Sequence, residues 1–251
     1  MNTPPHLSIV TGASRGMGRA ITEQLLQPGH QVLAIARRFD PALATLAAER
    51  GARFEAWPLD LADAPAAAER LAQWLSTMKP VNAALINNAA ALSEPGPLRS
   101  SALAELSQAT RVGLEAPLLL SAAFLRATAT WGTDRRILNI SSGLGRRAMA
   151  GSASYCAVKA GMDHFSRAVA LEETGRPHGA RIVSLAPGII DTDMQLQLRT
   201  ADRRLFPDGA QFEAFKTEGR LDSPADAAAK VLRFLARADF GSNPVADVRD
   251  A

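Results

Sequence analysis

One tyrosine and one lysine form a pair that could carry out acid–base chemistry. Tyr155 is the only tyrosine in the 251-residue chain, and Lys159 follows it four positions later in a segment typical of a helix. Side chains four apart on a helix share one face, about 5–6 Å apart at Cβ. We expect the ammonium to lower the pKa of Tyr155 from about 10 towards neutral pH. Such a phenol suits general acid–base catalysis, although most pairs at this spacing are a ring beside a solvated amine.

A glycine-rich turn follows the first strand-like run of the chain. Its three glycines permit a tight turn and let backbone N–H groups approach a ligand closely. The helix after the turn points its positive end at it, which suits a pyrophosphate. The spacing differs from G-x-G-x-x-G, but strand, turn and helix come in the order that dinucleotide binding requires. The residues of this turn that we expect to bind the ligand are Gly12, Ser14, Arg15, Gly16, Met17 and Gly18.

The end of the second strand distinguishes the two nicotinamide cofactors. An acidic residue there would bind the ribose 2′-hydroxyl, whereas an arginine would accept a 2′-phosphate. The chain has Arg37 and Arg38 at this place, and the nearest acid, Asp40, comes later. Because a planar guanidinium suits phosphate, we predict NADP(H), with Arg37 as the main contact and Arg15 and Arg38 as helpers. The alternative is that these arginines are simply solvated.

Short apolar runs alternate with longer amphipathic segments along the chain. Strands are predicted at residues 7–11, 31–36, 53–57, 83–87, 136–140 and 181–185, with a possible edge strand at 245–248. Helices are predicted at residues 19–27, 41–50, 64–77, 101–128, 152–174 and 225–236. This alternation is typical of βαβ units and a parallel sheet covered on both faces. We predict an α/β protein with a single-domain, doubly wound Rossmann fold over residues 1–251.

Residues 190–223, which we call the substrate loop, break this alternation. The segment has no clean strand and is long for a connection, and such loops in compact domains are usually lids or binding loops. Its apolar residues are Met194, Leu196, Leu198, Leu205, Phe206, Phe212 and Phe215. This content suits a flap over a non-polar ligand, and the alternative is a pair of ordinary surface helices.

Composition narrows the class of protein further. Hydrophobic residues make up 47% of the chain, enough for a sizeable core. The net charge is +3 and no run of basic residues exceeds two, so we expect no nucleic-acid surface. Cys156 is the only cysteine, which fits a reducing compartment, and no apolar run reaches the roughly 18 residues of a membrane span. From these two observations we expect a cytoplasmic protein. The four histidines have no Cys or His partners at metal-ligand spacing, so we expect no metal site.

Together these residues resemble the short-chain dehydrogenase/reductase family over residues 7–248. The glycine turn is similar to the family's motif, and Ser142 precedes Tyr155 by the family's usual interval of 13 residues. The resemblance implies that Ser142, Tyr155 and Lys159 are catalytic. It also implies that Asp60 and Leu61 meet the adenine and that Asn88 and Ala89 lie at the adenosine ribose. The implied nicotinamide contacts are Pro187, Gly188, Ile190 and Thr192, with Tyr155 and Lys159 at the nicotinamide ribose.

Within the family, residues 141–159 and 187–197 are similar to the sepiapterin-reductase-like branch and to benzil reductases that form (S)-benzoin. This similarity implies an NADPH-dependent carbonyl reductase acting on a ketone or diketone flanked by aromatic or other apolar groups. Two alternatives are a weakly catalytic NADP(H)-binding protein with a regulatory role, and a reductase of a pterin, a sugar or an acyl-carrier ketoester. The family resemblance also implies a homodimer or homotetramer built from the helices at 101–128 and 152–174.

The chain departs from the family pattern at two positions. Gly113 stands where the family usually has an asparagine that shapes a helix bulge and holds a water linked to Lys159. A damaged relay at Gly113 is the main support for the weakly catalytic alternative, and we expect Gly113→Asn to preserve or raise turnover. Ala90 replaces a glycine near the adenosine ribose, and we expect a modest effect there.

Overall fold

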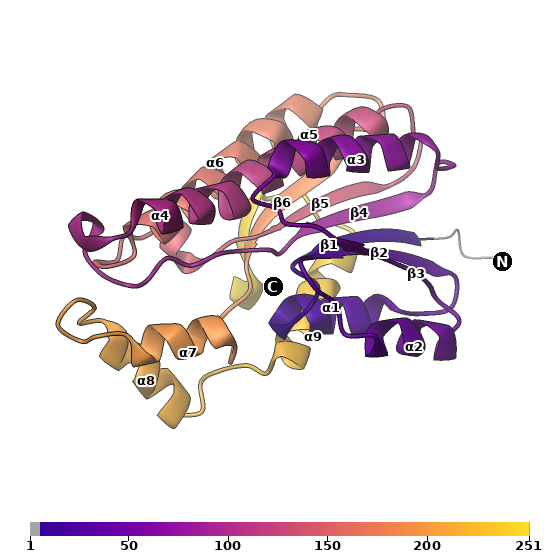
Figure 1. Cartoon of the computed structure of the whole chain (residues 1–251). Helices are drawn as coiled ribbons and strands as arrows, with labels where there is room; N and C mark the ends of the chain where they lie inside the picture. The colour runs from indigo at the N-terminus through magenta and orange to yellow at the C-terminus, as the bar shows by residue number, and fades with distance from the viewer. Residues whose placement is uncertain (1–5, 251) are drawn as a thin grey trace.

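A parallel β-sheet forms the centre of the protein in the computed structural model, which describes residues 6–250 (Figure 1). Its strands are β1 (His6–Thr11), β2 (His30–Ala36), β3 (Arg53–Pro58), β4 (Asn82–Asn87), β5 (Arg135–Ile140), β6 (Arg181–Ala186) and β7 (Val245–Asp247). They pair in the order β3-β2-β1-β4-β5-β6-β7, each pair parallel. Every predicted strand is present to within one residue at either end. The predicted α/β doubly wound fold is therefore confirmed.

Helices cover both faces of this sheet (Figure 1). One face packs α1 (Gly16–Leu25), α2 (Ala42–Glu49) and α9 (Pro224–Ala236). The other packs α3 (Ala64–Ser76), α5 (Ala116–Ala127) and α6 (Ala153–Glu173). Among residues 6–250, no helix is long and apolar enough to cross a membrane.

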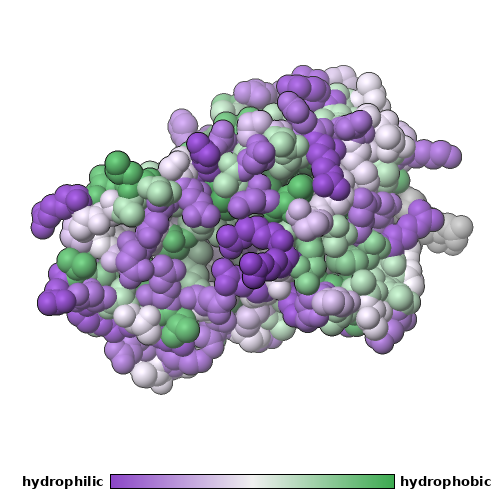
Figure 2. Space-filling model, in the orientation of Figure 1, coloured by the Kyte–Doolittle hydropathy of each residue, from purple (hydrophilic) through white to green (hydrophobic). Residues whose placement is uncertain are grey.

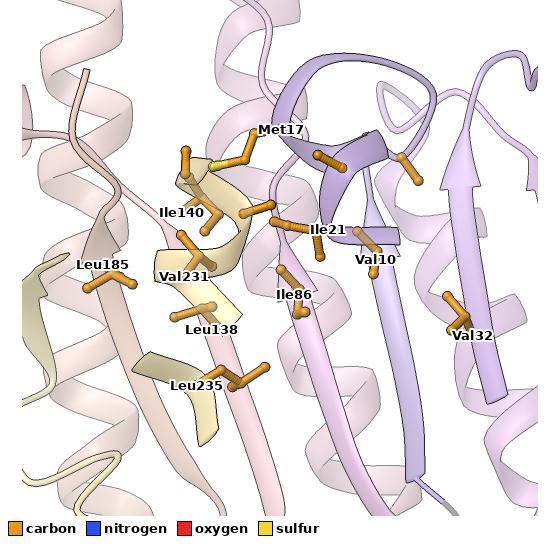
Figure 3. Close-up of a cluster of buried hydrophobic side chains, with 14 of the residues drawn as sticks. Val10, Met17, Ile21, Val32, Ile86, Leu138, Ile140, Leu185, Val231 and Leu235 are labelled. Carbon is orange, nitrogen blue, oxygen red and sulfur yellow. The ribbon is translucent and has the colours of Figure 1, made fainter. Parts of the chain in front are cut away.

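The alternating side chains of each strand supply both apolar cores. In β1, Ile9 and Val10 are both fully buried, but they pack against opposite helical layers. Figure 3 shows one core, where Ile21 of α1 and Val231 of α9 lie against side chains of the central strands. Each such buried aliphatic side chain contributes about 1.5–3 kcal/mol relative to exposure. This packing holds the strand ends, and therefore the site, in place.

The predicted helix over residues 101–128 is interrupted. It divides into α4 (Leu103–Thr110), a π-helical turn (Arg111–Glu115) and α5. Pro117 lies in the first turn of α5 and lacks the N–H that would bond the carbonyl of Gly113 in a continuous α-helix. A π turn beside the proline accommodates this missing hydrogen bond, and such turns are frequent at functional sites.

The strand order places a reversal point between β1 and β4. From β1 the chain builds β2 and β3 on one side and then crosses to build β4 to β7 on the other. Ligands of open parallel sheets bind outside the carboxyl ends of the strands at this reversal. Two further helices, α7 (Asp193–Thr200) and α8 (Gly209–Thr217), lie apart from the two layers, beyond this edge (Figure 1).

Candidate active site

A cavity of about 770 Å³ lies along the carboxyl edge of the sheet. The glycine turn, the ends of β4, β5 and β6, the start of α6 and the substrate loop line it. Ser142 and every residue predicted to bind the cofactor contribute to its lining, with the exception of Arg38. In the space-filling view, strongly hydrophilic side chains gather at the middle of this face, between α7 and α8 at lower left and α1 at lower right (Figure 2).

The glycine turn is packed tightly against the end of β4. Asn88 Nδ2 donates to the Thr11 carbonyl at 2.9 Å, and Thr11 Oγ1 accepts from the backbone N–H groups of Asn88 and Ala89, each at 3.0 Å. A Cβ at Gly18 would lie 2.2 Å from the Gly12 carbonyl oxygen and 2.3 Å from Asn88 Nδ2. No side chain fits there, so glycine at this position serves close packing of the turn and the strand.

The amino end of α1 is open towards the cavity. No side chain caps this end, and the first turn of the helix contains no acidic residue. Gly16, Met17 and Gly18, the first residues of the helix, all line the cavity. The unsatisfied N–H groups and the positive end of the helix dipole form an anion site. The observed turn therefore fits a dinucleotide diphosphate, and the helix starts earlier than predicted because the glycine motif forms its first turn.

Arg37 lies at the rim of the cavity just after β2. It is exposed and has no ion-pair partner within residues 6–250. Asp40 is engaged elsewhere, since it pairs with Arg19 at 2.9 Å and accepts from the Ala42 N–H at 3.0 Å. The prediction for Arg38 was wrong in one respect: this side chain does not line the cavity. The chain bends at Arg37 directly after β2, and of the two arginines only Arg37 lines the cavity.

The structure brings Ser142, Tyr155 and Lys159 together in the cavity. Tyr155 and Lys159 come from the first two turns of α6, with Lys159 Nζ 5.6 Å from the centre of the Tyr155 ring. Lys159 is 2% exposed and donates to the Ile140 carbonyl at 2.6 Å. Ser142 follows β5 directly, and its hydroxyl accepts from the Leu144 N–H at 3.2 Å.

The expected effect of Lys159 on Tyr155 requires correction. Withdrawal from bulk water raises the pKa of the Tyr155 phenol above its ordinary value, and the neighbouring Ser142 hydroxyl opposes that rise. Burial also lowers the pKa of Lys159 to about 8, while the Asp163 carboxylate acts in the opposite direction. At neutral pH the phenol therefore keeps its proton and the lysine keeps its charge, an arrangement that suits an acid rather than a base.

Asp163 is a buried carboxylate next to Ser142, and the sequence interpretation missed it. It is 1% exposed, and its Oδ1 accepts from the Ser141 hydroxyl at 2.5 Å and from the Ser184 hydroxyl at 2.7 Å. Arg146 Nε lies 3.4 Å from its other oxygen. These contacts tie α6 to β5 and β6 next to Ser142. The spacing Tyr155, Lys159, Asp163 places all three on one helix face and could have revealed this residue.

The substrate loop folds as two helices that cover the cavity. Phe206 and Phe212 form an apolar cluster with Leu144 and Met149, and Tyr155 packs against this cluster. The loop is therefore helical, as in the surface-helix alternative, and it also faces the site. The apolar side chains of the loop that line the cavity are Ile190, Met194, Leu198, Phe212 and Phe215.

Two aspartates of the substrate loop are paired with basic side chains. Asp191 lies 2.6 Å from Lys216 Nζ and 3.3 Å from Arg199, and these cations lower the pKa of its carboxyl. Asp193 pairs with Arg15 of the glycine turn at 2.9 Å. Both residues of this second pair are exposed, so its contribution is small. The pair nonetheless brings the glycine turn and α7 together at the edge of the cavity.

Gly113 is buried in the π turn and lies against α6. A Cβ at this position would be 2.6 Å from Val158 Cγ1. Val158 directly precedes Lys159, and its β-branched side chain cannot move without a change of rotamer. The expectation that asparagine would be tolerated at position 113 is therefore revised, because this site is built around glycine.

We expect Gly113→Asn to destabilise the protein by about 1–3 kcal/mol, as overpacked cores do. Turnover should fall with stability, since displacement of Val158 shifts Lys159. Thermal unfolding and steady-state kinetics of the purified variant would measure both effects. The matched control is Gly113→Asn combined with Val158→Ala, which removes the clashing methyl group and should recover most of the loss. Full stability and turnover in the single variant would contradict this account.

The comparisons with known proteins agree with this geometry. The family profile described as short chain dehydrogenase matches residues 7–203. Fold and site thus define an oxidoreductase, and the chain belongs to the short-chain dehydrogenase family. It is 34% identical over 240 residues to a benzil reductase ((S)-benzoin forming) of Bacillus cereus, covering 94% of this chain and 96% of that protein.

Two further similarities point the same way. The chain is 32% identical over 257 residues to sepiapterin reductase of Rattus norvegicus, covering 96% of this chain and 95% of that protein. A solved structure of a metagenomic short-chain oxidoreductase in complex with NADP is 28% identical, with a TM-score of 0.73, over 97% of this chain and 95% of that one. The predicted family and branch are confirmed.

Proposed function

We propose that this protein is an NADPH-dependent carbonyl reductase acting on ketones or vicinal diketones that carry aromatic or other apolar groups. The observation that carries the proposal is the arrangement of one cavity. Ser142, Tyr155 and Lys159 lie between an open helix terminus suited to a diphosphate and an apolar cluster of the substrate loop. A dinucleotide and an apolar carbonyl compound would meet at Tyr155.

The chain's own residues account for cofactor binding. The glycine turn and the amino end of α1 would hold the diphosphate, and Asp60 and Leu61 would border the adenine. Arg37 is the cation available for a 2′-phosphate, and Asp40, the nearest acid, is engaged by Arg19. Pro187, Gly188, Ile190 and Thr192 line the cavity after β6, where they would orient the nicotinamide. A bound reduced nicotinamide supplies hydride to the carbonyl carbon of the substrate.

The catalytic side chains then act on the carbonyl oxygen. The Tyr155 phenol, kept protonated by its raised pKa, donates its proton as negative charge develops on that oxygen. The Ser142 hydroxyl stabilises the same charge by a hydrogen bond. Lys159, held by the Ile140 carbonyl, would bind the nicotinamide ribose and supply a positive charge beside the phenol.

The substrate class is inferred from the lining of the substrate loop and from the relatives. Leu144, Leu198, Phe212 and Phe215 present an apolar surface beside Tyr155. The relative from Bacillus cereus is described as a benzil reductase, and benzil is a diketone with two phenyl groups. An apolar, aromatic ketone would gain affinity here by displacing water from these side chains.

A test of this proposal measures NADPH and NADH oxidation by the purified protein with benzil. We expect turnover with a clear preference for NADPH. Arg37→Leu should lower kcat/KM for NADPH about 10–100-fold, because it removes charge-assisted hydrogen bonds to the 2′-phosphate. The same substitution should leave kcat/KM for NADH nearly unchanged.

Arg38→Leu is the matched control, since Arg38 is exposed and does not line the cavity. Equal use of the two cofactors, with no effect of Arg37→Leu, would contradict the NADPH assignment. Binding of NADPH without turnover of any ketone would favour the weakly catalytic, regulatory alternative.

A further inference from the structure

Gln195 carries a buried side-chain amide in the wall of the active-site cavity. Gln195 lies in α7, is 4% exposed, and lines the active-site cavity. Its Oε1 atom is buried and has no hydrogen-bond partner among the described residues. Buried amides without partners are destabilising and uncommon in native proteins, so each needs an explanation.

Gln195 lies close in sequence to an apolar part of the active-site cavity. Leu198, one helical turn further on, lines the same cavity and packs with the cluster that contacts Tyr155. Two carboxylates of the cavity are already paired, Asp191 with Lys216 and Asp247 with Arg249, both at 2.6 Å. Gln195 is a neutral hydrogen-bonding group one helical turn from the apolar cluster that contacts Tyr155, and its side-chain oxygen has no partner in the described structure.

We propose that Gln195 is a specificity-determining residue that binds a second oxygen of the substrate, carried on the carbon beside the reacting carbonyl. This inference rests on the proposed function and deepens it. Ser142 and Tyr155 serve the reacting oxygen, so a second oxygen of a vicinal diketone needs another partner. A half-turn about the terminal torsion of glutamine presents either its N–H₂ or its oxygen. The amide therefore donates to a carbonyl or accepts from a hydroxyl, which selects vicinal diketones and α-hydroxyketones over simple ketones.

The test compares two substrates that share both phenyl rings, benzil and deoxybenzoin. They differ by the second carbonyl oxygen. The quantity measured is the ratio of kcat/KM for benzil to kcat/KM for deoxybenzoin, with NADPH saturating. The intrinsic reactivities of the two ketones cancel when this ratio is compared between variants. If wild-type turnover of deoxybenzoin is too slow to measure, the activated simple ketone trifluoroacetophenone takes its place.

We expect Gln195→Met, which keeps the length of the side chain, to lower this ratio about 10–100-fold by removing one hydrogen bond to the second oxygen. The matched control is Gln197→Met on the same helix. Gln197 does not line the cavity, and its amide donates to Glu94 at 3.4 Å. The control should leave the ratio unchanged. Gln195→Leu provides a second reading of the ratio if the methionine variant does not fold.

The outcomes separate this inference from the proposed function. A ratio unchanged in Gln195→Met, with both substrates still reduced, would overturn the role of Gln195 and leave the carbonyl reductase proposal standing. A wild-type protein that binds NADPH but reduces neither substrate class would overturn the proposed function, and this inference with it. A lowered ratio with unchanged NADPH affinity would support both.

Discussion

Replacing Tyr155 by phenylalanine is expected to lower kcat for ketone reduction by about 10²–10⁴-fold, the usual contribution of a positioned general acid. The substitution removes only the hydroxyl and keeps the ring that packs against the substrate loop. NADPH affinity and thermal stability should therefore stay near the wild-type values. Consumption of NADPH with benzil would measure turnover, and a fluorescence titration would measure cofactor binding.

The neighbouring Cys156 offers a matched control for this experiment. It is adjacent in sequence and half-buried, but it does not line the cavity. Cys156→Ala should keep turnover within the range of the wild-type protein. Near-full activity of Tyr155→Phe would remove the proposed acid from the mechanism and would direct attention to another proton donor.

Raising the pH through about 8 is expected to lower kcat/KM for NADPH, approaching tenfold for each further pH unit. The group responsible is Lys159, whose pKa burial lowers to about 8. Lysine is charged below its pKa, so the cation proposed to bind the nicotinamide ribose is present at neutral pH and lost above pH 8. The pKa of Tyr155 moves in the opposite direction, above its ordinary value, so its ionisation does not explain this decline. Because kcat/KM reports the free enzyme, the cofactor-free structure is the relevant one.

Asp163→Asn provides the decisive variant for this pH profile. The carboxylate of Asp163 raises the pKa of Lys159, so its removal should move the decline to lower pH. Asparagine keeps the shape of the side chain and can still accept from the Ser141 and Ser184 hydroxyls. Glu172→Gln, an exposed position on the same helix, removes an equal charge far from the site and should leave the profile unchanged. A profile that is flat to pH 10, or unmoved in Asp163→Asn, would contradict the assignment to Lys159.

Two expectations from the sequence stay predictions. A homodimer or homotetramer would bring together surfaces of α5 and α6, where Leu118 and Leu171 are 43% and 78% exposed. Such apolar exposure is compatible with self-association. The cytoplasmic location also stays a prediction.

The amino-acid sequence by itself determined the architecture, and all but one of the site residues that it predicted line the cavity. Strand and helix periodicities are local properties, so they identified seven strands to within one residue at either end. Glycine spacing and the tyrosine–lysine pair are also local, and the order of strands and helices brings them to one edge of the sheet.

Only the tertiary structure decided the pKa values, the packing and the long-range hydrogen bonds of the site. The direction of the Tyr155 pKa depends on burial, which adjacent residues do not reveal. The closeness of Gly113 to Val158 and the bonds of Asp163 to two strands join segments far apart in the chain. The place of Gln195 in the cavity wall, with its side-chain oxygen unpartnered among the described residues, depends on how α7 packs. Desolvation and long-range packing depend on contacts between distant segments of the chain. A local pattern of residues therefore does not predict them.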